Sequence, residues 1–275
     1  MSTTEDRPIR TAPTMTSYVN GAPASVEQLQ ALSLSNFGHY TSMRIEGGRA
    51  KGLGIHLGRL RRDCRLVFGT QLDTEKVVEY MRQAVAGRAG DLALRVTVFD
   101  PALGLIRVAG ETDPHVMVTV REARSGPWPP LSAKSFRFVR DTAEVKHIGL
   151  FSQFHYRRQA TLAGFDDAIF VERDARLSEG ATWNLGFVAR NGDLLWPDAP
   201  VLPGVTMQLL QRALPKMQTL PISLGNLGEM RAAFATNAGF GVRPISRIDG
   251  FDYPPDDPGI TAVQEAYDAL PGQSL

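Results

Sequence analysis

Two spacings of hydrophobic residues alternate along this chain, and together they predict a mixture of helices and strands. In the segment HLGRLRRDCRLVFG, Leu57, Leu60, Cys64 and Val67 recur every three or four residues, which predicts a helix that ends at Gly69. Further helices are expected at 74–87, 150–164 and 205–214.

Shorter runs rich in β-branched and aromatic residues predict strands. They lie at 40–45, 92–100, 115–123, 135–141, 166–172, 177–195 and 232–237. The run 177–195 is expected to fold back at Asn191-Gly192, because this pair favours a tight hairpin turn. Helices and strands are mixed without regular βαβ alternation, which favours an α+β fold over a doubly wound sheet.

A proline-rich segment, RSGPWPPLS at 124–132, is the best candidate for a linker, because proline neither extends a helix nor serves a central strand. It separates an expected small N-terminal α+β domain at 15–123 from a larger C-terminal domain at 133–275. The polar residues 1–14 are expected to form a poorly ordered tail.

Composition narrows the remaining classes of function. The chain has 275 residues and a formal net charge of +1, which gives no reason to expect nucleic acid or an anionic membrane as partner. Cys64 is the only cysteine, which excludes an internal disulfide. The five histidines lack metal-ligand spacing, and no metal is expected. Without an apolar span of about 20 residues or a secretory signal, a cytoplasmic location is expected.

One candidate for chemistry is Lys146, in TAEVKHIGLF between a predicted strand and a predicted helix. Its neighbours Val145, Ile148 and Leu150 are apolar, and such surroundings lower the pKa of an amine. A lysine that attacks a carbonyl carbon must be neutral, so this environment suits a Schiff-base lysine. A surface lysine is the commoner fate of this residue type and is the alternative here.

A second candidate is Glu179, an acid inside the apolar strand run LSEGATWNLGFV. A buried carboxylate is costly unless it meets a cation, and a protonated pyridine nitrogen is one such cation. An ion pair with an arginine is the alternative on this feature alone.

Three dispersed segments could bind an anion. Pro203-Gly204-Val205-Thr206 opens a predicted helix, whose free N–H groups favour a phosphate. Arg59 adds a cation on an earlier helix, although its arginine neighbours are also consistent with a solvated basic face. The small-residue loop Thr236-Asn237-Ala238-Gly239 follows a strand and can present backbone N–H groups.

These residues fall in the order of one family's motifs. The matching segments are YVNGAPAS, GHYTSMRI, HLGRL, VKHIG, LSEGATWN, LPGVT and TNAGFGVRPISRIDG. The chain thereby resembles the fold type IV pyridoxal 5′-phosphate (PLP) enzymes, or class IV aminotransferases, which include branched-chain and D-amino-acid aminotransferases, (R)-selective amine transaminases and 4-amino-4-deoxychorismate lyases. LSEGATWN, close to the family's EGATSN signature, is the most specific match.

The resemblance implies a two-domain α+β fold, a homodimer, and PLP bound between the domains near the linker. It implies that Lys146 forms the Schiff base and moves a proton between substrate and cofactor, while Glu179 keeps the pyridine nitrogen protonated. It assigns the cofactor phosphate to Arg59, Gly204, Val205, Thr206, Asn237 and Ala238.

The expected reaction is transfer of an amino group between an amino acid or amine and a 2-oxo acid. The alternative within enzymes is the lyase that releases pyruvate from aminodeoxychorismate, because Lys146-His147 and Asn237-Ala238 are closer to its pattern. Phe151 stands where branched-chain enzymes have a tyrosine. A family member without enzymatic activity that serves in interactions is a third reading. The sequence leaves the donor, the acceptor and the stereochemical preference open.

The substrate-binding residues are the least defined part of this prediction. Tyr40 matches an aromatic position of the family's first motif strand, where Thr41 replaces a frequent glutamate. Arg44 on the same strand and Arg95 in LALRVTVFD are both candidates to bind the substrate carboxylate. Either arginine could instead belong to a structural ion pair.

Overall fold

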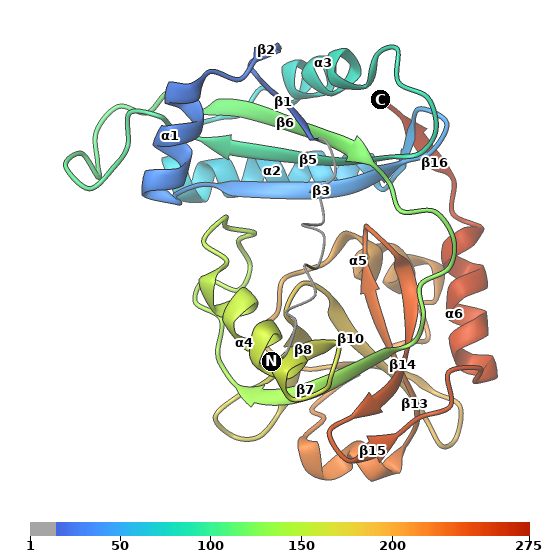
Figure 1. The fold of residues 1–275 in the computed structure, drawn as a ribbon. Helices are drawn as coiled ribbons and strands as arrows, with labels where there is room; N and C mark the ends of the chain where they lie inside the picture. Colours follow the sequence, from blue (N-terminus) through green and yellow to red (C-terminus); the bar gives the residue numbers. More distant parts are fainter. Residues whose placement is uncertain (1–14) are drawn as a thin grey trace, which may run out of the picture.

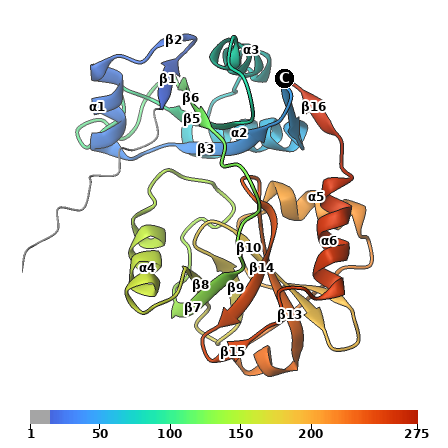
Figure 2. The same cartoon turned by 45° about the vertical axis from the view of Figure 1, so that its right-hand side comes forward.

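The computed structural model describes residues 15–275, and in it the chain forms two large sheets, one above the other in Figures 1 and 2. The tail expected at 1–14 lies outside the described residues. The first sheet is antiparallel and has five strands, in the order β2 (Ala22–Pro23), β1 (Thr16–Val19), β6 (His115–Glu122), β5 (Leu92–Phe99) and β3 (His39–Ile45).

Two helices cover one face of this sheet. They are α2 (Leu53–Phe68) and α3 (Thr74–Val85), and side chains such as Leu60, Val77 and Met81 fill the core between helix and strand. Helix α2 ends at Gly69, as predicted, where a φ of 70° suits glycine.

The helix α1 (Val26–Ser35) was not predicted from the sequence. No residue of it is buried, so it lacks the apolar stripe on which the prediction of helices relied. Its signal is a capping box, in which the Ser25 side chain accepts from the Gln28 N–H and the Gln28 side chain accepts from the Ser25 N–H.

The second sheet has nine strands and closes on itself. Eight follow the order β12 (Gln218–Leu220), β11 (Leu194–Pro197), β10 (Asn184–Ala189), β13 (Met230–Asn237), β14 (Gly241–Ile248), β7 (Leu131–Arg137), β8 (Asp167–Val171) and β9 (Leu177–Gly180), and β15 (Phe251–Asp252) pairs with β14. Strand β9 also pairs with β10, through Glu179 opposite Asn184. This closure encloses a core that includes Leu131, Ile169 and Phe187.

Helices lie on the outside of this closed sheet. Helix α4 (Phe151–Leu162) packs on β7 and β8, while α5 (Val205–Ala213) and α6 (Pro258–Asp268) pack on each other and on β13. A 3₁₀ helix, η1 (Leu224–Glu229), precedes β13. The C-terminal strand β16 (Gly272–Ser274) returns to the first sheet region and pairs with β4 (Arg49–Lys51), as Figure 1 shows.

The mixed architecture confirms the α+β class, and two strand boundaries need correction. The strand expected at 135–141 is β7, which begins and ends earlier, at Leu131 and Arg137. Strand β14 pairs with it from Leu131 onward and β8 pairs with it from Ala133 onward. The run 177–195 is interrupted at 181–183 as well as at the predicted turn, giving three strands. Residues 123–130 contain no helix or strand; the proposed domain boundaries remain a prediction.

Candidate active site

A small cavity between the two sheets contains the predicted lysine. Lys146 lies in the segment between β7 and α4, and it lines a cavity of about 190 Å³ together with Tyr40, Arg59 and Glu179. The Lys146 Nζ stands 4.7 Å from the centre of the Tyr40 ring. We call this space the lysine cavity.

The electrostatics of this cavity favour a neutral lysine. The pKa of Lys146 falls from its usual 10.5 to about 7, first through burial and then through the nearby cations Arg59 and Arg140, while Glu179 opposes the shift. The sequence predicted the direction of this shift from apolar neighbours alone. The structure adds that arginines contribute, because a second positive charge next to a cation is unfavourable.

Lys146 is fixed to the first sheet through its backbone. Its carbonyl oxygen accepts a hydrogen bond from the Tyr40 N–H at 2.8 Å, and the Ile148 N–H donates to the Gly38 carbonyl at 3.0 Å. The lysine segment thus runs beside the start of β3, although about a hundred residues separate the two in sequence. This pairing holds the lysine at the boundary between the two sheets.

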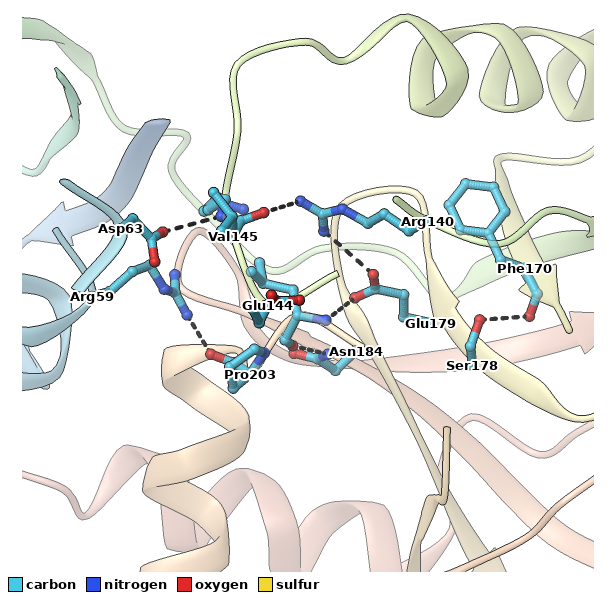
Figure 3. A network of polar contacts seen from close by, with 12 residues as sticks. Arg59, Asp63, Arg140, Glu144, Val145, Phe170, Ser178, Glu179, Asn184 and Pro203 are labelled. Atoms are coloured by element: carbon cyan, nitrogen blue, oxygen red, sulfur yellow. Dashed lines mark hydrogen bonds and ion pairs between the residues drawn. The ribbon is translucent and has the colours of Figure 1, made fainter. Parts of the chain in front are cut away.

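Glu179 lies on β9 and only 5% of its surface is exposed. Burial raises the pKa of Glu179, and three neighbours oppose that rise: the Arg140 guanidinium, the Leu202 N–H and the Lys146 amine. The Leu202 N–H donates to Glu179 Oε2 at 3.2 Å, and Arg140 Nη1 lies 3.3 Å from Oε1. Figure 3 shows Arg140 and Glu179 pointing toward each other.

Arg140 is a site residue that the sequence analysis missed. It lines the lysine cavity and its side chain is 9% exposed. Within the sequence it is an arginine near the end of the predicted strand SFRFVRD, with no local pattern that sets it apart. Arg140 forms an ion pair with Glu179. An arginine ion pair was the alternative that the sequence left open for this carboxylate. A carboxylate has about four lone-pair positions, so these two partners leave room for a further donor from the cavity.

One wall of the lysine cavity carries predicted phosphate-binding residues. Arg59 on α2 is 5% exposed, and its guanidinium donates to the Pro203 carbonyl just before α5, a contact drawn in Figure 3. Burial lowers the pKa of Arg59 to about 10, with Asp63 opposing, so the side chain stays charged at neutral pH. Gly204 and Val205, at the start of α5, also line this wall.

Because Gly204 has no side chain, the backbone at the start of α5 is left uncovered at this wall of the cavity. A Cβ at this position would collide with the Asn184 amide oxygen, and that amide donates to the Leu202 carbonyl at 2.8 Å. A side chain is therefore excluded where the first N–H groups of α5 begin. Such bare helix starts are suited to phosphate oxygens.

Not all predicted phosphate residues face the same way. Asn237 and Ala238 line the lysine cavity, and Asn237 Oδ1 accepts from the N–H groups of Gly239 and Phe240 at 2.8 and 3.0 Å. Thr206 does not line the lysine cavity; it lines a second cavity of about 670 Å³, which Ala238 also lines. The backbone of Thr206 still belongs to the first turn of α5.

The residues present fit a phosphorylated ligand. Three buried polar atoms of residues that line the lysine cavity, Arg59 Nε, Arg140 Nε and Thr236 Oγ1, have no hydrogen-bond partner among residues 15–275. Buried polar groups in native proteins are almost always paired. An anion with several acceptor oxygens, placed beside Arg59 and the start of α5, provides such partners.

The substrate candidates separate into two groups. Arg95 stacks on Tyr40, with the guanidinium carbon 3.7 Å from the ring centre, and lines an adjoining cavity of about 750 Å³. Arg44 lines the same adjoining cavity, but it forms ion pairs with Glu46 and Asp91, both at 2.6 Å. Neither arginine lines the lysine cavity itself. Arg95 differs from Arg44 in that it lies against Tyr40, a residue of the lysine cavity, and has no carboxylate partner among residues 15–275.

Two further positions bear on the expectations from sequence. Phe151 is 81% exposed and is not part of the lysine cavity, whereas Gln153, two residues later, is buried and lines it. No residue of the linker 124–132 lines the lysine cavity itself. The adjoining cavities are lined in part by linker residues, namely Arg124, Gly126, Pro127 and Trp128.

The described part of the chain contains no cluster of three or more potential metal ligands. Nor does any helix within residues 15–275 combine the length and the apolar character needed to span a bilayer.

Comparison with known proteins identifies the family. Residues 38–248 match the family model described as amino-transferase class IV. The chain therefore belongs to the class IV aminotransferases, a family of PLP-dependent enzymes, and the predicted family is confirmed. No curated protein matches the sequence significantly.

Solved structures of this family share the fold at low sequence identity. A hypothetical aminotransferase from Mycobacterium tuberculosis in its apo form is 20% identical with a TM-score of 0.79, covering 93% of this chain and 98% of that one. The branched-chain aminotransferase from Thermoproteus uzoniensis with norvaline is 23% identical with a TM-score of 0.76, covering 92% and 93%. A fold IV transaminase from Curtobacterium pusillum is 22% identical with a TM-score of 0.72, covering 85% of this chain and 83% of that one. The predicted fold type IV is thereby confirmed.

Proposed function

We propose that this protein transfers an amino group between an amino acid or amine and a 2-oxo acid, with PLP in the lysine cavity. The observation that carries the proposal is that Lys146 and Glu179 line one cavity together with Arg59 and the start of α5. PLP carries an aldehyde, a ring nitrogen and a phosphate. The Lys146 amine suits the aldehyde, the Glu179 carboxylate suits the protonated ring nitrogen, and Arg59 with the start of α5 suits the phosphate.

The residues that hold the cofactor follow from this arrangement. Arg59 and the backbone N–H groups of Val205, Thr206 and Ala238 would hold the phosphate, with Gly204 allowing close approach. Glu179 would hold the ring nitrogen in its protonated form, and Lys146 would supply the amine that bonds to the aldehyde carbon. PLP, when bound, supplies an electron sink that stabilises negative charge at the substrate Cα.

Lys146 also acts as the proton carrier in this proposal. With its pKa lowered to about 7, Nζ is neutral in a far larger share of molecules at neutral pH than the amine of an ordinary lysine. A neutral Nζ can take the proton from the substrate Cα and then return it, and a pKa near the working pH is the most effective for both steps. An ordinary lysine would be almost wholly protonated at this pH.

Arg95 is the proposed partner of the substrate carboxylate. None of the ion pairs within residues 15–275 involves Arg95, and its one side-chain hydrogen bond, from Nε to Thr97 Oγ1, is long at 3.3 Å. Burial lowers the pKa of Arg95, and Tyr40 opposes this. An acidic acceptor is consistent with the M. tuberculosis protein, one of whose solved structures holds α-ketoglutarate and the pyridoxamine form of the cofactor.

The proposed active form is a homodimer, as the family resemblance implies. Exposed apolar side chains support an additional interface, with Phe151 81% and Phe154 64% exposed on α4. Light scattering in solution measures this directly, and a monomer at working concentration would contradict it. The cytoplasmic location stays a prediction.

The experiment that tests the function is a donor panel on the purified holoenzyme. L-amino acids, D-amino acids and (R)-amines are each supplied with a 2-oxo acid, and formation of the new amino acid is measured. Lys146→Ala should abolish turnover while leaving phosphate-anchored PLP able to bind. A holoenzyme that is inert toward every donor would contradict the proposal and favour an interaction role.

The lyase remains the second candidate, because Lys146-His147 and Asn237-Ala238 resemble that pattern and exposed Phe151 stands apart from the cavity. The same preparation distinguishes the two. A lyase releases pyruvate from aminodeoxychorismate without any 2-oxo acid acceptor, whereas an aminotransferase depends on the acceptor.

A further inference from the structure

The peptide unit that joins Val145 to Lys146 is held at both ends by charged side chains. Its N–H donates to Asp63 Oδ2 at 3.1 Å, and its carbonyl oxygen accepts from Arg140 Nη2 at 2.8 Å. Figure 3 shows the peptide between Asp63 and Arg140. Hydrogen bonds to ionised groups are about twice as strong as neutral ones, and bonds at the two ends of one amide strengthen each other.

Asp63 is itself rigidly placed. It lies on α2, its surface exposure is 0%, and Arg62 donates to its Oδ1 from Nε at 2.9 Å and from Nη2 at 2.6 Å. The same Arg62 donates to the Glu144 carbonyl at 2.6 Å. Helix α2 therefore contacts residues 144–146 through two hydrogen bonds, one from Arg62 to the Glu144 carbonyl and one from the Lys146 N–H to Asp63. The same helix carries Arg59 one turn before Asp63.

We call the contacts that Asp63, Arg62 and Arg140 make with residues 144–146 the clamp. These contacts extend from the lysine peptide to the carboxylate of Glu179. Arg140, which holds the Val145 carbonyl, also contacts Glu179 at 3.3 Å. Asp63, the lysine peptide, Arg140 and Glu179 thus form one connected line of polar contacts from α2 to β9, visible in Figure 3.

We propose that Asp63 is a positioning residue, which acts through the Val145–Lys146 peptide to fix the Lys146 amine relative to Glu179. Asp63 does not line the lysine cavity, so it acts without touching substrate or cofactor. A fully buried carboxylate carries a desolvation cost that a hydrophobic residue would avoid. The inference rests on the proposed function for its consequence, whereas the clamp itself is measurable without substrate.

Substitution of Asp63 tests the clamp in steps. Asp63→Asn keeps the shape and one acceptor oxygen but not the charge, and a fall in kcat of about 10-fold is expected. Asp63→Ala removes the acceptor as well, and displacement of a reacting group by about 1 Å costs about 100-fold. KM for the amino donor should change little in both variants. The fall in kcat should be smaller in Asp63→Asn than in Asp63→Ala, because the conservative change keeps one acceptor oxygen.

Hydrogen–deuterium exchange gives a readout that does not depend on turnover. In the holoenzyme without substrate, exchange of the Lys146 amide should become about 10-fold faster in Asp63→Ala, because a charge-assisted hydrogen bond is lost. The increase should be confined to peptides that cover 144–148.

A matched control is Asp257→Asn. Asp257 is likewise buried, accepts two hydrogen bonds from Arg231 at 2.7 and 3.0 Å, and accepts the Gly259 N–H at 2.7 Å, but it caps α6 away from the lysine cavity. It should lose stability as the Asp63 variants do, with kcat and exchange at 144–148 unchanged.

The outcomes decide the proposal. Unchanged Lys146 exchange and unchanged kcat in Asp63→Asn and Asp63→Ala would overturn it, as would faster exchange spread evenly over the chain. If Asp63→Ala does not fold, Asp63→Asn and Arg62→Gln serve instead, and Arg62→Gln should show the same local exchange to a smaller degree. A wild-type enzyme inert to all donors would remove the proposed function while leaving the exchange result intact.

Discussion

Replacing Lys146 with methionine should make the apoprotein more stable at low pH, even though it removes the central residue of the site. The protein lowers the pKa of Lys146 from 10.5 to about 7, chiefly through burial. At about 1.4 kcal/mol for each pKa unit, the folded state disfavours the ammonium form by about 5 kcal/mol relative to the unfolded chain. Methionine is similar in length, adaptable and uncharged.

The gain in stability has a defined pH dependence. Below pH 7 the lysine is protonated in both states, so the folded protein carries the full cost and the variant should be about 5 kcal/mol more stable. Between pH 7 and 10.5 the unfolded chain binds more protons, so wild-type stability rises with pH and the difference falls to about 2 kcal/mol at pH 9. Above pH 10.5 both forms of Lys146 are neutral and the difference should disappear.

Urea unfolding of the apoproteins at pH 6 and pH 9 measures this difference. The apoprotein is required because a bound cofactor stabilises the folded state by mass action. Lys216→Met is the matched control at an exposed lysine, where little change is expected because the side chain stays in water. A Lys146→Met variant that is no more stable at pH 6 than at pH 9, relative to wild type, would refute the reasoning.

Four further predictions concern the cavity walls. Glu179→Gln should retain bound PLP yet slow turnover by about 100-fold; equal rates in a stopped-flow assay would count against its role at the ring nitrogen. Arg59→Met should weaken PLP binding by about 10- to 100-fold, seen by fluorescence titration, since a charge-assisted contact is lost, and an unchanged Kd would exclude it from the phosphate site. Arg95→Gln should raise KM for the 2-oxo acid about 10-fold with a smaller effect on kcat; steady-state kinetics with KM unaltered would leave the carboxylate without this partner. Gly204→Ala, whose Cβ would collide with Asn184, should lower stability by about 1–3 kcal/mol and weaken PLP binding, and a variant with wild-type thermal stability and Kd would show that the wall adapts.

The sequence by itself determined most of the elements and the order of the chemically active motifs. Periodic burial is a local property, so the spacing of Leu57, Leu60, Cys64 and Val67 was enough to predict α2 and its end at Gly69. The order of the motifs along the chain identified Lys146, Glu179 and the anion-binding turn at 203–206 as parts of one site. Helix α1 escaped prediction because none of its residues is buried, and its available signal was the capping residue Ser25. Helix α6 was also not predicted, although it buries Ile260 and Val263 at helical spacing and begins after the capping residue Asp257.

Only the tertiary structure decided which charged residues share the site. Arg44 and Arg95 look alike on neighbouring strands, yet Arg44 is neutralised by Glu46 and Asp91 while Arg95 stacks on Tyr40 beside the lysine. Which carboxylates approach an arginine depends on strand register and on how segments far apart in sequence pack, and neither is encoded in local spacing.

The same reason explains why Arg140 and Asp63 were not foreseen. Arg140 reaches Glu179 because β9 pairs with β8, which in turn pairs with β7, so a carboxylate 39 residues away in sequence lies near the segment that follows β7. Asp63 meets Lys146 across 83 residues because α2 packs beside the segment that carries the lysine. The local sequence around Lys146 was enough to identify it as a candidate, but its pKa and its position depend on the elements that surround it.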